Sequence, residues 1–215
     1  MSMKIWQKKY KKQKFYWGLK PEKGLKEVLK HTPRGVALDI GAGEGRNSIF
    51  LAKNGFKVEA IDKIKGGLDK CEEIAKKYNL PIKTKVVDIR KFRFENNKYS
   101  LILSIVALDF LKFPEIQKVI LKIKKSLKKG GVFYLLIFSI KDPLFKKCKQ
   151  KQLRMVEKNT FYLPKLKTFQ HFFEKKELLN LLNSFKIIKI EEKRIKDTHG
   201  GKVHFHCVIR IIAKK

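Results

Sequence analysis

Three glycines and an aspartate form the most informative group of residues in the sequence. Gly41, Gly43 and Gly45 alternate with other residues after a short apolar run that contains Asp39, and a helical pattern opens at Arg46. A dinucleotide-binding loop has the spacing G-x-G-x-x-G and presents a helix N-terminus to a pyrophosphate. Here the spacing is G-x-G-x-G, and the carboxylate of Asp39 would repel a pyrophosphate but attract an ammonium group. The group therefore predicts a site for S-adenosylmethionine (SAM), whereas a simple tight turn is the alternative for the loop taken alone.

Two more acidic residues follow strand-like runs. Asp62 ends the run 56–62, and Asp88 follows the run 82–87 and precedes Ile89. An acid about 20 residues after the glycines is where a nucleotide ribose is held, so we expect Asp62 to accept from both ribose hydroxyls. We expect Asp88 to accept from the adenine amino group and Ile89 to cover the ring. An acid after a strand can also be a turn or N-cap residue. Three of them at successive strand ends favour a ligand along the carboxyl edge of a parallel sheet.

The region 16–140 resembles class I SAM-dependent methyltransferases and, within them, the tellurite-resistance methyltransferase group. The resemblance is carried by residues 38–48, 51–56, 86–89 and 101–111 and by the turn 129–131. It continues weakly through 199–215. It implies methyl transfer with SAM as the cofactor. It also implies that Arg46, Asn47 and Ser104 contact the cofactor, and that His199 and Lys202 border the acceptor.

Three positions depart from the family's pattern. Ser100 stands where an aspartate often opens the fourth strand, and Gly200 stands where an arginine follows the family's histidine. Asp109 lies near a pocket position that is apolar or histidine in relatives, and a carboxylate there would disfavour an anionic substrate. The resemblance therefore implies methyl transfer but leaves the acceptor open.

Helical and strand-like patterns alternate along the chain. Apolar stripes at helical spacing begin at Leu25, Leu68, Ile116 and Leu178, between the strand-like runs. This alternation predicts an α/β fold: a Rossmann-like, doubly wound, mostly parallel seven-stranded sheet with an antiparallel C-terminal strand and helices on both faces.

The length limits the number of domains. With 215 residues and 43% hydrophobic content, the chain can bury one sizeable core, so we expect one domain over 1–215. Residues 1–34 would form a basic arm and a helix. Residues 141–170 contain two prolines and no clean period, and we expect them to form a substrate lid.

The net charge of +32 is unusual. Of 52 basic residues 7 are arginines, which leaves 52 − 7 = 45 lysines. Recognition of phosphates and bases tends to use arginine for its bidentate fork. The lysine excess therefore fits background composition, with weak nucleic-acid association as a possible consequence. An RNA-associated methyltransferase, or a SAM-fold module that binds nucleic acid, is the alternative function.

The N-terminal residues 4–17 mix lysines with large aromatic side chains. Such a mixture can bind nucleic acid or an anionic membrane. We favour instead an arm that folds over the cofactor, with Phe15, Tyr16 and Trp17 near the adenosine.

The C-terminal run 203–211 alternates like a strand, which puts His204 and His206 on one face. A metal site needs further ligands, and the sequence identifies no carboxylate or thiolate for that task. We therefore expect no metal. His199 and Lys202 are expected to orient the acceptor, and His199 is the one candidate base if the acceptor must lose a proton.

The predicted reaction is methyl transfer to a small soft or anionic acceptor, such as a tellurium, selenium or thiol compound. A sulfonium methyl is already activated, so the protein's main task is to align the acceptor. The apolar runs are shorter than the roughly 18 residues that span a bilayer, and no secretory leader is evident. Three scattered cysteines without a C-x-x-C pair favour a reducing cytoplasm.

Overall fold

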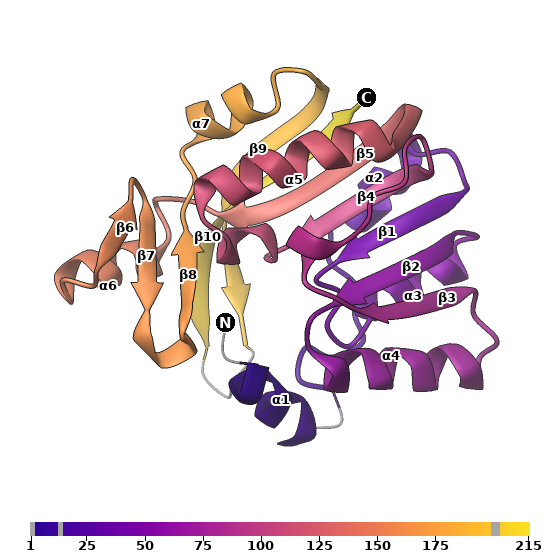
Figure 1. The fold of residues 1–215 in the computed structure, drawn as a ribbon, viewed down its shortest axis with the longest axis horizontal. Helices are drawn as coiled ribbons and strands as arrows, with labels where there is room; N and C mark the ends of the chain where they lie inside the picture. The colour runs from indigo at the N-terminus through magenta and orange to yellow at the C-terminus, as the bar shows by residue number, and fades with distance from the viewer. Residues whose placement is uncertain (1–2, 13–14, 199–202) are drawn as a thin grey trace.

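A seven-stranded sheet forms the centre of the protein in the computed structural model, which describes residues 3–12, 15–198 and 203–215 (Figure 1). The strand order is β3-β2-β1-β4-β5-β10-β9. The strands are β1 (Val36–Ile40), β2 (Lys57–Asp62), β3 (Ile82–Val86), β4 (Tyr99–Ile105), β5 (Leu127–Phe138), β9 (Lys186–Asp197) and β10 (His204–Lys214). Strands β1 to β5 pair in parallel, whereas β10 is antiparallel to both β5 and β9. The predicted doubly wound sheet with an antiparallel C-terminal strand is confirmed.

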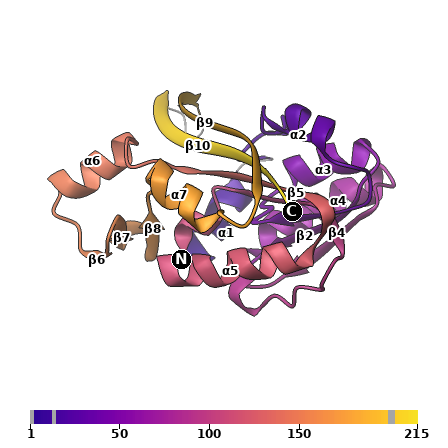
Figure 2. The same cartoon turned by 90° about the horizontal axis from the view of Figure 1, so that it is seen from above.

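Helices cover both faces of this sheet (Figure 2). One face carries α2 (Leu25–His31), α3 (Arg46–Lys53) and α4 (Lys65–Lys77), and the other carries α5 (Phe113–Ser126) and α7 (Lys175–Leu181). Alternate side chains of a strand point to opposite faces. Leu101 and Leu103 of β4 accordingly pack with the α2 and α3 side, and Ile102 packs with the α5 side. Burial on both faces explains why this strand is mostly apolar.

The helix α1 (Met3–Lys12) lies at the end of the sheet toward which β1 and β2 point (Figure 1). Its side chains Trp6 and Tyr10 are buried against Ile64, which precedes α4. The basic arm is therefore a helix docked at the carboxyl edge of the parallel strands.

The segment 141–170 has secondary structure of its own. It contains α6 (Pro143–Gln150), β6 (Met155–Glu157), β7 (Thr160–Leu163), the short 3-10 helix η3 (Pro164–Leu166) and most of β8 (Thr168–His171). The three strands form a small antiparallel sheet. The aromatic rings of Phe145, Phe161 and Phe172 pack together with edge-to-face geometry and hold α6 to this sheet. A role for this segment as a lid stays a prediction.

Two further 3-10 helices, η1 (Ile89–Lys91) and η2 (Leu108–Phe110), follow β3 and β4 at the carboxyl edge. Among the described residues, no helix combines the length and the apolar character needed to cross a membrane.

Candidate functional site

The glycine loop, residues 41–45, connects β1 to α3 where the strand order reverses between β1 and β4. All three glycines have positive φ: 73° at Gly41, 55° at Gly43 and 80° at Gly45. A Cβ at Gly41 would lie 2.5 Å from the Cβ of Ala107, and one at Gly45 would lie 2.2 Å from the Sγ of Cys71. Glycine is therefore required here by backbone conformation and by packing.

Two of the predicted acids hold this loop in place. The carboxylate of Asp39 is buried and accepts a hydrogen bond of 2.6 Å from the hydroxyl of Ser48, and burial raises its pKa to about 6. Asp62 accepts from the amide of Gly43 at 2.9 Å and from the amide of Ile64 at 2.8 Å. Burial raises the pKa of Asp62 as well. The end of β2 is thus bonded directly to the glycine loop.

The third predicted acid has a different environment. The carboxylate of Asp88 caps η1 and binds the guanidinium of Arg90, with one N–O distance of 2.6 Å. This bonding holds the pKa of Asp88 well below its usual range. Ile89 packs against the main core. A contact of these two residues with adenine stays a prediction.

Ser104 lies on β4 and pairs with Ile40 of β1. Ile40 is the residue immediately before the glycine loop. Its hydroxyl is buried and has no hydrogen-bond partner among the described residues. A buried polar atom without a partner at this point fits a site that a polar ligand completes.

Arg46 and Asn47 bind the N-terminal segment, and their predicted contact with the cofactor stays a prediction. The guanidinium of Arg46 donates to the carbonyl of Trp17 at 3.3 Å, and the side-chain oxygen of Asn47 accepts from the amide of Glu22 at 2.9 Å. Glu44 is nearly enclosed; it accepts from the amide of Trp17 at 3.0 Å and pairs with Lys70 at 2.7 Å. Sequence reasoning did not identify the part that Glu44 plays.

An aromatic cover, made of Trp6, Tyr10, Tyr16 and Trp17, lies over the glycine loop. The ring centroid of Trp6 is 6.0 Å from that of Tyr10 and 5.8 Å from that of Trp17. The hydroxyl of Tyr10 is 3.0 Å from the position of a Cβ at Gly43. The arm therefore folds over the glycine loop, and Trp6 and Tyr10 are its most buried aromatic members. Their helical spacing of four residues is the signal that would have identified them. A position of Phe15, Tyr16 and Trp17 near the adenosine stays a prediction.

Asp109 is not part of an open pocket wall. It lies on η2 and is 0% exposed, and its Oδ2 accepts from the amide of Phe138 on β5 at 2.8 Å. Its Oδ1 has no partner among the described residues. Burial raises the pKa of Asp109 to about 7. Burial favours the neutral form of this carboxyl group, which opposes the expectation that a full negative charge here repels an anionic acceptor.

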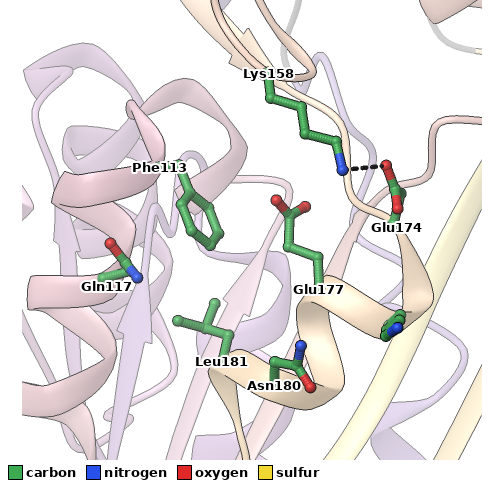
Figure 3. A pocket seen from close by; sticks show the side chains of 8 residues that line it. Phe113, Gln117, Lys158, Glu174, Glu177, Asn180 and Leu181 are labelled. Atoms are coloured by element: carbon green, nitrogen blue, oxygen red, sulfur yellow. Dashed lines mark ion pairs between the residues drawn. The ribbon is translucent and has the colours of Figure 1, made fainter.

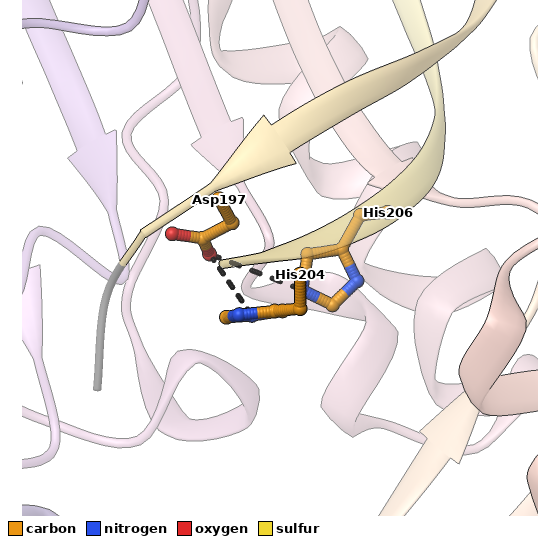
Figure 4. A group of neighbouring side chains, drawn as sticks. All are labelled: Asp197, His204 and His206. Atoms are coloured by element: carbon orange, nitrogen blue, oxygen red, sulfur yellow. Dashed lines mark ion pairs between the residues drawn. The ribbon is translucent and has the colours of Figure 1, made fainter. Parts of the chain in front are cut away.

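The predicted acceptor residues His199 and Lys202 lie outside the described residues, between β9 and β10. The neighbouring histidines are described: His204 and His206 face Asp197 across the β9–β10 pair (Figure 4). The sequence identified no carboxylate near these histidines. The tertiary structure supplies one, since the antiparallel pairing puts Asp197 directly opposite His204.

The profile of the family "Tellurite resistance protein TehB" matches residues 3–200. The chain belongs to the TehB family. Curated relatives in this family are named as probable S-adenosyl-L-methionine-dependent methyltransferases.

Individual relatives of this TehB-family chain agree with that assignment. The probable S-adenosyl-L-methionine-dependent methyltransferase TehB of Haemophilus influenzae is 33% identical over 94 residues, which cover 44% of this chain and 32% of the relative. The chain thus spans about a third of the length of that curated relative. A SAM-dependent methyltransferase structure from Methanosarcina mazei has a TM-score of 0.71 at 23% identity, covering 88% of this chain and 96% of the other. The TehB structure from H. influenzae has a TM-score of 0.69 at 22% identity, covering 89% and 60%.

A separate pocket of about 550 Å³ lies between α5, α7 and the turn before β7 (Figure 3). The ion pair between Lys158 and Glu174, at 3.0 Å, lies beside it, and Phe113 and Leu181 line its apolar side. None of the described residues that are predicted to hold the cofactor lines this pocket. The pocket is therefore distinct from the cofactor site.

Proposed function

We propose that the protein transfers a methyl group from SAM to a small soft or anionic acceptor, such as a tellurium or selenium oxyanion or a thiolate. The observation that carries the proposal is the bond between Asp62 and the amide of Gly43. It joins an acid at the end of β2 to the glycine loop after β1, which is where a nucleoside cofactor is held in doubly wound sheets.

The residues around the loop fit this cofactor. Ser104 offers a buried hydroxyl without a described partner. Each carboxylate oxygen of Asp62 has a second lone pair, so its bonds to Gly43 and Ile64 leave capacity for ribose hydroxyls. We assign the aminoacyl end to the side of Asp39, and the adenine to the side of Asp88 and Ile89.

SAM supplies a sulfonium methyl that needs no further activation. The chain's own task is to exclude water and to hold an acceptor lone pair in line with the carbon–sulfur bond, about 3 to 3.5 Å from the methyl carbon. The aromatic cover suits the first task, because Trp6 and Tyr10 are buried over the loop. We assign the second task to His199 and Lys202. A soft acceptor requires no strong base.

The charge of the molecule supports an anionic acceptor. A net charge of +32 attracts small anions to the whole surface. The same charge would attract RNA, which is why an RNA-associated activity is the competing function. We also propose a cytoplasmic location, in line with the free thiols of Cys71, Cys148 and Cys207.

The test measures methyl transfer from labelled SAM to a panel of tellurite, selenite, a small thiol and RNA. We expect transfer to at least one of the small acceptors and none to RNA. Calorimetric titration with S-adenosylhomocysteine serves as the control for an intact cofactor site. If the protein binds the cofactor but transfers methyl groups only to RNA, the proposed acceptor class is wrong. If it does not bind the cofactor, the whole proposal is refuted.

A further inference from the structure

Asp197, His204 and His206 form an Asp-His-His cluster at the junction of β9 and β10 (Figure 4). The Oδ2 of Asp197 is 3.6 Å from the Nε2 of His204 and 3.9 Å from the Nε2 of His206. One ligand atom from each residue lies within 4.8 Å of the other two. Figure 4 shows the three side chains turned toward one another from the two strands.

The fold creates this cluster by strand pairing. His204 and His206 are two residues apart on β10, so their side chains leave the same face of the strand. Asp197 is the residue opposite His204 in the antiparallel pairing of β9 with β10. The extended backbone therefore brings together three donors of the kind that bind transition metals.

A second carboxylate orients one of the histidines. The Nδ1 of His206 is 3.0 Å from the Oδ2 of Asp142, whose side chain is 0% exposed. Asp142 also accepts from the amides of Cys207 and Leu144, at 2.8 Å and 2.7 Å, which fixes its position. A carboxylate that accepts at Nδ1 keeps the proton there and directs the Nε2 lone pair to the opposite side of the ring. This is the arrangement that supports metal-binding histidines.

We propose that Asp197, His204 and His206 bind one divalent transition-metal ion through a carboxylate oxygen and two Nε2 atoms. Donors about 2.1 Å from a tetrahedral ion are about 3.4 Å apart, which requires only small side-chain movements from the distances above. Two imidazoles and one carboxylate suit zinc, iron(II) or cobalt(II). Three protein ligands leave a coordination position open.

The cluster lies at the carboxyl edge of the sheet. The ring of His206 packs on Phe138 at 4.7 Å between centroids, and Phe138 is the last residue of β5. His204 is the more accessible of the two histidines, with a side-chain exposure of 43% against 19% for His206. Solvent can therefore deliver an ion to the site. If the proposed methyl transfer holds, the open position would suit an oxyanion or thiolate acceptor beside the cofactor. Only this use of the open position rests on the proposed function.

The experiment uses the full chain without a polyhistidine tag, after chelator treatment and without cofactor or acceptor. Calorimetric titration with Zn²⁺ is expected to give one ion per chain. Titration with Co²⁺ is expected to give the visible absorption of a cobalt ion bound by nitrogen and oxygen. Asp197→Asn and His206→Gln are each expected to weaken Zn²⁺ binding at least tenfold. Asp142→Asn leaves all three ligands in place and is expected to weaken it about 10- to 100-fold.

The matched control is His31→Gln. His31 lies on α2, where its Nε2 is 3.5 Å from the Oε1 of Glu27. It is thus an ordinary histidine–carboxylate pair, and Zn²⁺ binding should not change. The proposal is overturned if the wild-type chain binds no Zn²⁺, if binding survives both ligand variants unchanged, or if the cobalt spectrum shows a thiolate ligand such as Cys207. The cobalt spectrum of the wild-type chain reports the ligand atoms of the bound ion even where a variant fails to fold. Since no step involves SAM, failure here leaves the proposed function untouched.

Discussion

At the residue scale, Asp62 combines a proposed role in cofactor binding with a structural role that the sequence did not reveal. We propose that it accepts from a ribose, and the structure shows that it accepts from the amides of Gly43 and Ile64. Asp62→Ala would therefore loosen the loop as well as remove a ligand contact. Gly41→Val is no better as a probe, because positive φ and the nearby Ala107 make any side chain there destabilising in itself.

Asp62→Asn is the more selective change, because the amide oxygen keeps one of the two backbone bonds and the charge is removed. We expect the affinity for S-adenosylhomocysteine to fall by tenfold or more, which corresponds to about 1.4 kcal/mol of binding free energy. The free energy of unfolding without ligand should decrease by less than this. Calorimetric titration and a thermal melt measure the two quantities. If the folded variant binds S-adenosylhomocysteine as tightly as the wild type does, Asp62 does not contact the cofactor.

The buried carboxyl of Asp109 predicts a dependence of stability on pH. Its pKa rises from an ordinary 3.8 to about 7 in the folded protein. Between these values the folded state binds the proton more tightly than the unfolded state does. The free energy of unfolding therefore decreases as the pH rises through this window, and the full penalty is present above pH 7.

Asp109→Asn removes this titration and keeps an oxygen acceptor for the amide of Phe138. The unfolding free energy of the variant, relative to wild type, should increase by roughly 2 to 3 kcal/mol between pH 5 and pH 8. Denaturant titrations at a series of pH values measure the difference, and Asp39 contributes equally to both proteins. A difference that stays constant across this range would show that Asp109 does not titrate there.

At the element scale, α1 and the residues that follow it act on the glycine loop through aromatic packing and backbone bonds. The amide of Trp17 donates to Glu44, and its carbonyl accepts from Arg46. Trp6 packs on Trp17 and lies beneath the ammonium of Lys9, at 4.3 Å from the ring centroid. Lys9 therefore covers one ring of the buried aromatic face.

Trp6→Ala should lower the affinity for S-adenosylhomocysteine about tenfold, because it removes the centre of the aromatic cover and opens the loop to water. Lys8→Ala is the matched control: Lys8 is an exposed residue of the same helix, and its loss should leave the affinity unchanged. Both affinities can be measured by calorimetry. Equal affinities for the two variants would mean that the cover does not contribute to cofactor binding.

At the scale of the whole molecule, the +32 charge acts over long range and is screened by salt. If the lysine excess is background composition, the dissociation constant for S-adenosylhomocysteine should change little between about 50 and 200 mM salt. Retention on RNA should fall steeply over the same range. Parallel titrations on one preparation test this expectation. RNA binding that resists salt would favour a dedicated RNA surface.

Local pattern in the sequence determined the sheet, its helices and the glycine loop, because periodicity and glycine spacing act between near neighbours in the chain. The acids Asp39 and Asp62 were predicted at strand ends, and the parallel pairing of β1 with β2 brings those ends together. These local patterns did not predict the contacts between segments that are distant in the chain. Three such features depend on packing across more than one element. They are the hydrogen bond from the backbone of Trp17 to Glu44, the burial of Asp109, and the approach of Asp197 to His206. Only the tertiary structure decides such contacts, because many side chains of the right type compete for each position.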